Sequence, residues 1–102
     1  MVIYNVTLGV EESITKEWLD WMRTTHIPEV MGCGIFSKAQ ITRVITQTDN
    51  TNSFAISYTC ASMKELHQYQ INFSDKMQQK HIDLYGDKAI AFRTIMEVIE
   101  EF

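Results

Sequence analysis

Four segments of the chain have the residue pattern of β-strands. Three of them alternate apolar and polar positions: residues 2–10, 53–61 and 88–100. Residues 35–48 are predicted as a strand because they are rich in β-branched side chains. Alternation predicts three apolar faces, made of Val2, Tyr4, Val6, Leu8 and Val10, of Phe54, Ile56, Tyr58 and Cys60, and of Ile90, Phe92, Met96 and Val98. The polar residues 49–52 (DNTN) are typical of a turn, so the second and third strands are predicted to form a hairpin.

Apolar residues with helical spacing follow the first strand. On a helical wheel of about 100° per residue, one side collects Ile14, Trp18, Leu19, Trp21, Met22, Thr25 and His26. Ser13 is the predicted N-cap of this helix. Pro28 cannot donate a helical hydrogen bond, so we expect the helix to end or break near His26, with one further turn before Gly32.

A second helix is predicted to begin at the capping-box sequence SMKE, residues 62–65. Its apolar stripe consists of Met63, Leu66, Tyr69, Phe73, Met77 and Leu84, with Gln70 and His81 on the same side. Gly86 is expected to end this helix, because glycine readily adopts the left-handed conformation that follows many helices.

The order of the predicted elements is strand, helix, strand, strand, helix, strand. This is the ferredoxin-like βαββαβ pattern of the α+β class. It predicts a four-stranded antiparallel sheet with both helices on one face. At 102 residues the chain is expected to form a single domain, residues 1–102.

The sheet face away from the helices is predicted to be half polar. On the last strand this face is expected to carry Ala89, Ala91, Arg93, Ile95 and Glu97. Such a face suits association of two sheets into a homodimer, with Asn5, Arg93 and Glu97 forming polar pairs in the interface. A monomer with a mixed solvent face is the alternative. Arg93 and Asn5 are also candidates for recognising a carboxylate inside a barrel of two sheets.

The composition is that of an ordinary globular protein, with 45% hydrophobic and 22% charged residues. A formal net charge of −4, without a cluster of basic residues, argues against nucleic-acid binding. No apolar run approaches the roughly 20 residues of a membrane-spanning helix, and the N-terminus lacks the basic start of a signal peptide. We therefore expect no membrane association and a cytoplasmic location, with Cys33 and Cys60 as reduced thiols. No cysteine–histidine spacing predicts a metal site.

His26 is the leading candidate for chemistry. It is predicted to share an apolar helix face with Trp18, Trp21 and Met22, where a near-neutral imidazole can serve as general base, hydrogen-bond donor or metal ligand. The alternative is a structural histidine that bonds to a backbone carbonyl where the helix breaks. Glu29 is a candidate for orienting the ring, as a carboxylate orients a catalytic imidazole, or is a solvated surface residue.

Three motifs carry a resemblance to known proteins. Trp18 to Met31 has the form W-L-x-W-M-x-x-x-H-I-P-E-V-M, and the segments I-Y-N-V-T (Ile3–Thr7) and A-F-R-T (Ala91–Thr94) lie near the two ends of the chain. With the length and element order, these motifs resemble the dimeric α/β-barrel superfamily, and within it the domain-of-unknown-function family 4286. The resemblance covers nearly the whole chain and implies that two protomers join their sheets face to face. In enzymes of the superfamily the ligand usually lies between the sheet and the helices of one protomer.

The resemblance implies no particular activity, because the superfamily includes haem-degrading and antibiotic-biosynthesis monooxygenases, muconolactone isomerase-like enzymes and stress-response proteins. Our leading hypothesis is a small homodimer that binds a small hydrophobic or aromatic compound between the first helix and the sheet. If it is an enzyme, we expect cofactor-independent isomerisation, cyclisation or oxygenation with His26 as the acid or base. Ligand-binding walls are predicted at Trp18, Trp21, Met22 and Tyr4.

Two alternatives remain open. One is a haem-binding, monooxygenase-like protein with His26 or His81 as the axial ligand. The other is a non-enzymatic module that senses a ligand or assembles with a partner. Nucleotide-dependent chemistry and metallohydrolysis are not expected, because the chain has no glycine-rich phosphate loop and no zinc-type spacing.

Overall fold

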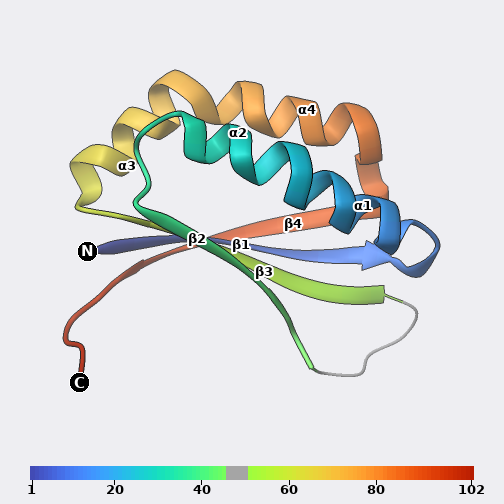
Figure 1. Ribbon diagram of the computed structural model, residues 1–102, viewed down its shortest axis with the longest axis horizontal. Coiled ribbons are helices and arrows are strands. Elements are labelled where there is room, and N and C mark those ends of the chain that lie inside the picture. The colour runs from blue at the N-terminus through green and yellow to red at the C-terminus, as the bar shows by residue number, and fades with distance from the viewer. Residues whose placement is uncertain (46–50) are drawn as a thin grey trace.

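A four-stranded antiparallel sheet forms one layer of the molecule, and helices cover one of its faces (Figure 1). The computed structural model describes residues 1–45 and 51–102. The strands are β1 (Val2–Glu11), β2 (Lys38–Arg43), β3 (Thr51–Cys60) and β4 (Ala89–Glu97). They lie in the order β2-β3-β1-β4, so the first and last strands of the chain are neighbours. The βαββαβ order and the antiparallel sheet predicted from the sequence are confirmed.

The boundaries of the hairpin differ from the prediction. β2 is shorter than the expected strand over residues 35–48. Residues 46–50 lie outside the described part of the chain, and with them half of the predicted turn at 49–52. The other half, Thr51 and Asn52, is not a turn but the start of β3, where it pairs with the end of β1. A long neighbouring strand therefore extends β3 through residues whose side chains favour turns.

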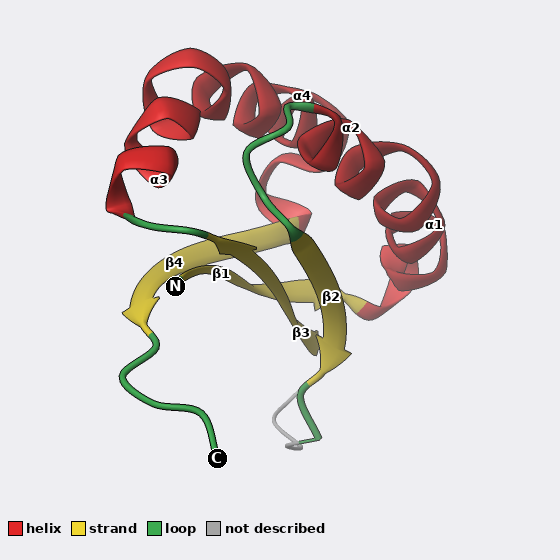
Figure 2. Ribbon diagram, turned by 60° about the vertical axis from the view of Figure 1, so that its left-hand side comes forward, coloured by secondary structure: helices red, strands yellow, loops and turns green. Residues whose placement is uncertain are grey.

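Two helical arms cross the sheet on the same side, as Figure 2 shows. The first helical arm consists of a 3-10 turn (Glu12–Ile14), α1 (Thr15–Trp21), a π-helical turn (Met22–His26) and α2 (Ile27–Gly32). The second helical arm consists of α3 (Met63–Tyr69), a π-helical turn (Gln70–Ser74) and α4 (Asp75–Tyr85). Each predicted helix is therefore present, but each contains a π-helical turn that the sequence pattern did not indicate.

Of the end or break expected near His26 from Pro28, the structure shows a break, because the α-helix is interrupted at Met22–His26 and resumes in α2. The N–H of Ile27 donates to the carbonyl of Met22, five residues earlier, which closes the π-helical turn. Pro28 then occupies the first turn of α2, where its missing N–H costs no hydrogen bond. The further turn expected before Gly32 is present as α2.

Every fourth residue of the first helical arm is buried. These residues are Ile14, Trp18, Met22, His26 and Val30. From Ile14 to Val30 an uninterrupted α-helix would rotate the side-chain direction by about 160° beyond whole turns, so both ends could not face the sheet. The π-helical turn has more residues per turn and offsets this drift. Thr25, which a regular wheel places on the buried face, is exposed for the same reason.

The helix starts and ends were predicted in part. Ser62 caps α3 as expected: its hydroxyl accepts a hydrogen bond from the N–H of Lys64 and contacts the Glu65 carboxylate. Gly86 follows α4 with a φ of 54°. Ser13, the predicted N-cap of the first helix, is not a cap, because the 3-10 turn begins before it, directly after β1.

The apolar stripe of the second helical arm is shorter than predicted. Leu66, Tyr69 and Met77 are buried, as expected. Three residues assigned to the same side are exposed, namely Met63, Gln70 and Leu84. The π-helical turn shifts the phase of the helix, so that its buried side continues through Ser74 and Met77. Leu84 lies seven residues after Met77 in α4 and is exposed near the C-terminal end of that helix.

The two faces of β4 are the reverse of the prediction. Residues that pair directly in an antiparallel sheet point to the same side, and Ala89, Ala91 and Arg93 pair with helix-facing residues of β1. These three residues therefore face the helices. Ile90 and Phe92 lie on the other side, where 67% and 64% of their surfaces are exposed. The two groups of alternating residues on β4 are those predicted, but each group lies on the opposite side of the sheet from the one expected.

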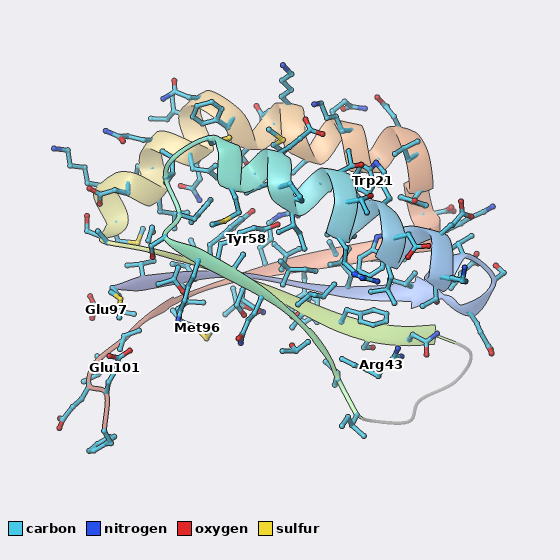
Figure 3. The ribbon with its side chains drawn as sticks, in the orientation of Figure 1. Trp21, Arg43, Tyr58, Met96, Glu97 and Glu101 are labelled. Carbon is cyan, nitrogen blue, oxygen red and sulfur yellow. The ribbon has the colours of Figure 1, made fainter. Side chains whose placement is uncertain are left out.

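We call the sheet side away from the helical arms the open face. Figure 3 shows Met96 on this side, whereas Tyr58 lies between the sheet and the helices. β1, β2 and β3 contribute mostly small or polar residues to it, such as Asn5 and Ser57. The large apolar side chains of the open face are therefore concentrated on β4. Residues 98–102 continue from β4 toward the same side (Figure 1).

The core assignment predicts unequal effects of two matched substitutions. Ile56 lies on β3 under the helices with 1% of its surface exposed, whereas Ile71 on the second helical arm is 82% exposed. Ile56→Ala should lower the free energy of unfolding by about 2–5 kcal/mol, because it removes buried methyl and methylene groups. Ile71→Ala should change it by less than about 0.5 kcal/mol. Urea denaturation measures both, and equal losses would contradict the assignment.

Candidate functional site

A cavity of about 40 Å³ lies between the sheet and the two helical arms. Its walls come from β1, β3 and β4 below and from both arms above. The residues that carry its chemistry are Tyr4, Met22, His26, Met77, His81 and Arg93. The cavity thus lies where the sequence predicted it, between the first helix and the sheet, with the second helical arm as an additional wall.

His26 ends the π-helical turn of the first helical arm and lines the cavity. Only 9% of its surface is exposed. Its ring stacks on Trp21, with ring centroids 4.7 Å apart and planes inclined by 24°. The Nδ1 atom of His26 is buried and has no hydrogen-bond partner among the described residues. The predicted place of His26 on a buried face is confirmed, and no backbone bond holds this nitrogen.

The surroundings of His26 keep its ring neutral. Burial lowers the pKa of His26 from 6.5 to about 4, and the nearby His81 and Lys80 act in the same direction, whereas the charge of Glu29 opposes them. At neutral pH one ring nitrogen is therefore able to accept a proton or a hydrogen bond.

His81 faces His26 from the second helical arm, with ring centroids 6.1 Å apart. Its Nε2 atom accepts a hydrogen bond of 2.9 Å from Nε1 of Trp18. This bond requires Nε2 of His81 to be unprotonated. Burial, and then the charge of Arg93, lower the pKa of His81.

Glu29 does not orient His26. Its carboxylate forms an ion pair with Lys80 across the two helical arms. The hydrogen bond from Lys80 is the main cause that lowers the pKa of Glu29. The Glu29 carboxylate therefore binds Lys80 of the second arm. A pattern along the first helix alone could not show this partner.

The predicted ligand-binding residues are divided by the structure. Tyr4 and Met22 line the cavity, but Trp18 and Trp21 are not among its lining residues. Trp18 is fully buried and packs on Phe54, with ring centroids 5.2 Å apart. Trp18 and Trp21 therefore contact residues of the cavity wall and not the cavity itself. Trp18 donates a hydrogen bond to His81, and Trp21 stacks on His26.

Arg93 lies on the opposite side of the sheet from the one predicted. Its Nε atom donates to the Tyr4 hydroxyl at 3.0 Å, and its side chain lines the cavity. Glu97, its predicted interface partner, pairs with Val2 and is also on the helix side of β4. Arg93 pairs with Val6, and this pairing puts it on the helix side of the sheet. The pairing joins segments far apart in the sequence, so the alternation of residues within one strand does not reveal it.

Asn5 does lie on the open face, as predicted. Its Oδ1 atom accepts a hydrogen bond of 3.0 Å from the Ser57 hydroxyl, and its Nδ2 atom donates to the Thr7 hydroxyl at 3.0 Å. The part of Asn5 in a dimer interface stays a prediction.

Three polar residues of the cavity wall were not singled out from the sequence: Tyr58, Tyr69 and Gln78. Burial raises the pKa of both tyrosines, so their hydroxyls stay protonated. The sequence pattern placed Tyr58 and Tyr69 on buried faces, but a pattern of burial does not show which polar atoms reach a cavity.

The cavity does not fit the haem alternative. A porphyrin is far larger than 40 Å³, and Nε2 of His81, one of the two proposed axial ligands, is engaged by Trp18. Within residues 1–45 and 51–102, no group of three or more His, Cys, Asp or Glu side chains is placed to hold a metal ion. Burial raises the pKa of both free thiols, Cys33 and Cys60, which disfavours their reactive thiolate form.

The sheet order and the two arms on one face define an α+β protein with the ferredoxin-like fold. The chain belongs to the family described as Domain of unknown function (DUF4286), which matches residues 1–99. No match is found among curated proteins. None of the helices described here is both long and apolar enough to cross a membrane.

Solved structures with this fold differ strongly from the chain in sequence. A dimeric ferredoxin-like protein from an uncultured marine organism is 12% identical with a TM-score of 0.77, over 99% of this chain and 97% of that one. A proposed antibiotic biosynthesis monooxygenase from Deinococcus radiodurans is 13% identical with a TM-score of 0.71, over 100% and 96%. An ethyl tert-butyl ether d (EthD) family protein from Bacillus halodurans is 13% identical with a TM-score of 0.70, over 97% and 100%. At these identities the likeness shows the fold alone.

The buried, neutral His26 predicts a pH-dependent stability. Its pKa is 6.5 when exposed and about 4 in the folded protein, so the unfolded chain binds more protons between these values. The free energy of unfolding should therefore fall as the pH decreases through this range. Between pH 7.5 and pH 5 the contribution of His26 should be about 2 kcal/mol.

Urea denaturation at the two pH values measures this loss. His26→Phe keeps an aromatic ring against Trp21 and removes both nitrogens, so it should lose this part of the pH dependence. An unchanged pH dependence in the variant would contradict the burial of a neutral His26.

Proposed function

We propose that the protein binds a small hydrophobic or aromatic molecule in the cavity between its helical arms and its sheet, with His26 as the group that exchanges a proton or a hydrogen bond with it. The observation that carries the proposal is the buried Nδ1 atom of His26, which has no partner among the described residues. Leaving such a nitrogen unpaired costs roughly 1–3 kcal/mol. Buried polar groups without partners are rare and are typical of functional sites.

The chemistry that suits a neutral imidazole begins with removal of a proton from the bound molecule. Isomerisation, cyclisation and oxygenation without a bound cofactor can all start in this way. With a pKa of about 4, His26 is a weak base in the free protein. Negative charge that develops on the ligand beside the ring would raise this pKa, so proton transfer would become more favourable as the reaction proceeds.

The size of the cavity limits the ligand. A volume of about 40 Å³ has room for two or three water molecules, at roughly 10–15 Å³ each. Met22 and Met77 form part of the wall, and methionine side chains adapt readily to a neighbour of different shape. A ligand with an aromatic ring is larger than this volume, so its binding requires these side chains to move. The small volume also supports a second candidate function, in which a ligand is sensed without being transformed.

The open face supports association of two copies of the chain. Ile90 and Phe92 expose large apolar side chains there, and an exposed apolar patch is typical of a contact surface. A neighbour with the same fold is described as dimeric. We propose a homodimer joined through the open face, with Asn5 inside the contact.

The free thiols Cys33 and Cys60 suit the reducing cytoplasm, where we place the protein.

The dimer is tested by substituting Phe92. Size-exclusion chromatography with light scattering at micromolar concentration should give the mass of two chains. Phe92→Lys places a charge in the contact and should convert the protein to a monomer. Ile71→Lys puts the same charge on the exposed side of the second helical arm and should leave the dimer intact. A monomeric wild-type protein would refute the proposal.

Ligand binding is tested with phenol and toluene as matched probes on protein labelled at the methionine methyl groups. Both probes should shift the NMR signals of Met22 and Met77, which line the cavity, and leave that of Met96 on the open face unchanged. In His26→Phe the affinity for phenol should fall about five- to tenfold, because one hydrogen bond is lost, while toluene should bind as before.

The melting temperature of the same variant separates the two interpretations of His26. A binding role predicts a melting temperature equal to or above that of the wild type, because an unpaired buried nitrogen is removed. A strongly lowered melting temperature with unchanged phenol binding would show that His26 is structural.

A further inference from the structure

We propose that the molecule bound in this cavity is an anion, a small carboxylic acid with an apolar body, and that Arg93 binds its carboxylate. The inference rests on the proposed function, because it names the chemical class that the same cavity takes. It is carried by the position of Arg93 on the helix side of β4 and by the groups that surround it.

Arg93 is exposed to solvent and places a positive charge at the edge of a cavity that has no negative side chain. Its side chain lines the cavity, and none of the lining residues is Asp or Glu. The ion pairs within residues 1–45 and 51–102 join Arg23 to Asp20 and Lys80 to Glu29, and neither includes Arg93. Because no carboxylate of the described residues pairs with it, this guanidinium is available to exchange its water for a negative group from outside the chain.

The hydrogen bonds of Arg93 leave its binding edge available. A guanidinium has five N–H donors in a rigid fork, and Nε uses one of them on the Tyr4 hydroxyl. The terminal nitrogens can then bind both oxygens of a carboxylate. Tyr4 accepts from Arg93 and so keeps its own hydroxyl hydrogen for a further acceptor. The bond to Tyr4 also fixes the guanidinium at the cavity wall, which reduces the entropy lost when a ligand binds.

The remaining wall residues agree with a carboxylate on an apolar body. Tyr69, whose hydroxyl stays protonated, and His81 line the same cavity as Arg93. Leu8, Ile56 and Met77 offer aliphatic surface. One cation with an aliphatic wall matches a carboxylate monoanion better than a phosphate, which carries more charge and needs more donors.

The test compares acids with neutral amides of nearly the same shape, in two sizes. Isobutyrate is compared with isobutyramide, and benzoate with benzamide, by the NMR shifts of the Met22 and Met77 methyl groups in the whole protein. Each acid should bind at least about tenfold more tightly than its amide, since a bond between two charged groups is stronger than one to a neutral group. This comparison in the wild-type protein needs no variant.

Three variants assign the preference to Arg93. Arg93→Gln should bind acid and amide equally, and Arg93→Lys should keep part of the preference, because it keeps the charge without the fork. Arg43→Gln is the matched control: Arg43 stands over the Phe54 ring at 4.9 Å and is not among the cavity-lining residues, so its loss should leave the preference unchanged.

The outcomes separate this inference from the function on which it rests. If the amides bind as tightly as the acids in the wild type, or if the preference survives in Arg93→Gln, the ligand is not an anion held by Arg93, and the proposed function stands. If neither acids nor amides nor the neutral probes shift Met22 and Met77, the proposed function fails and the inference fails with it.

Discussion

The π-helical turn at Met22–His26 is the constraint on which the site depends. An α-helix that followed the same path would turn one end of its apolar face away from the sheet, because residues four apart drift by about 40° each time. The π-helical turn removes this drift and keeps His26 over the cavity. The second helical arm has a turn of the same kind at Gln70–Ser74. After this turn, Met77 and His81 line the same cavity as His26. The two irregular turns together bring His26 and His81 to the same cavity.

These turns also explain which parts of the structure were accessible from the sequence. The order of the elements followed from two periodicities, two residues for strands and 3.6 for helices, and these are local properties. Thr25 was misplaced because a regular wheel has no means of representing a π-helical turn. Pro28 indicated an end or a break of the helix near His26, but it did not indicate that the break takes the form of a π-helical turn. The structure accommodates Pro28 in the first turn of α2, after the helix has been interrupted and resumed.

The site was predicted where it depended on one helix and missed where it depended on contacts between distant segments. His26, Met22 and Tyr4 were placed at the cavity from their own helix and strand. Arg93 was named as a candidate but was placed on the wrong face of the sheet, because its face is decided by pairing between the first and last strands. Glu29 was considered either as a group that orients His26 or as a solvated residue, and its ion pair with Lys80 was not foreseen because Lys80 lies on the other arm. In each case the sequence identified residue types suited to the chemistry, and tertiary contacts decided which of these residues contact one another.

The reversed faces of β4 also affect how readily the protein aggregates. β4 is an edge strand, so one row of its backbone N–H and C=O groups has no neighbouring strand in the described sheet. The same strand presents Ile90 and Phe92 on the side away from the helices. An unpaired edge beside an apolar surface is a template for adding strands from other molecules, which is how aggregates and fibrils begin. β4 is also synthesised after the other three strands of this sheet. A second copy of the chain packed on the open face would cover Ile90 and Phe92 and would leave only the narrow backbone edge of β4 accessible to other strands.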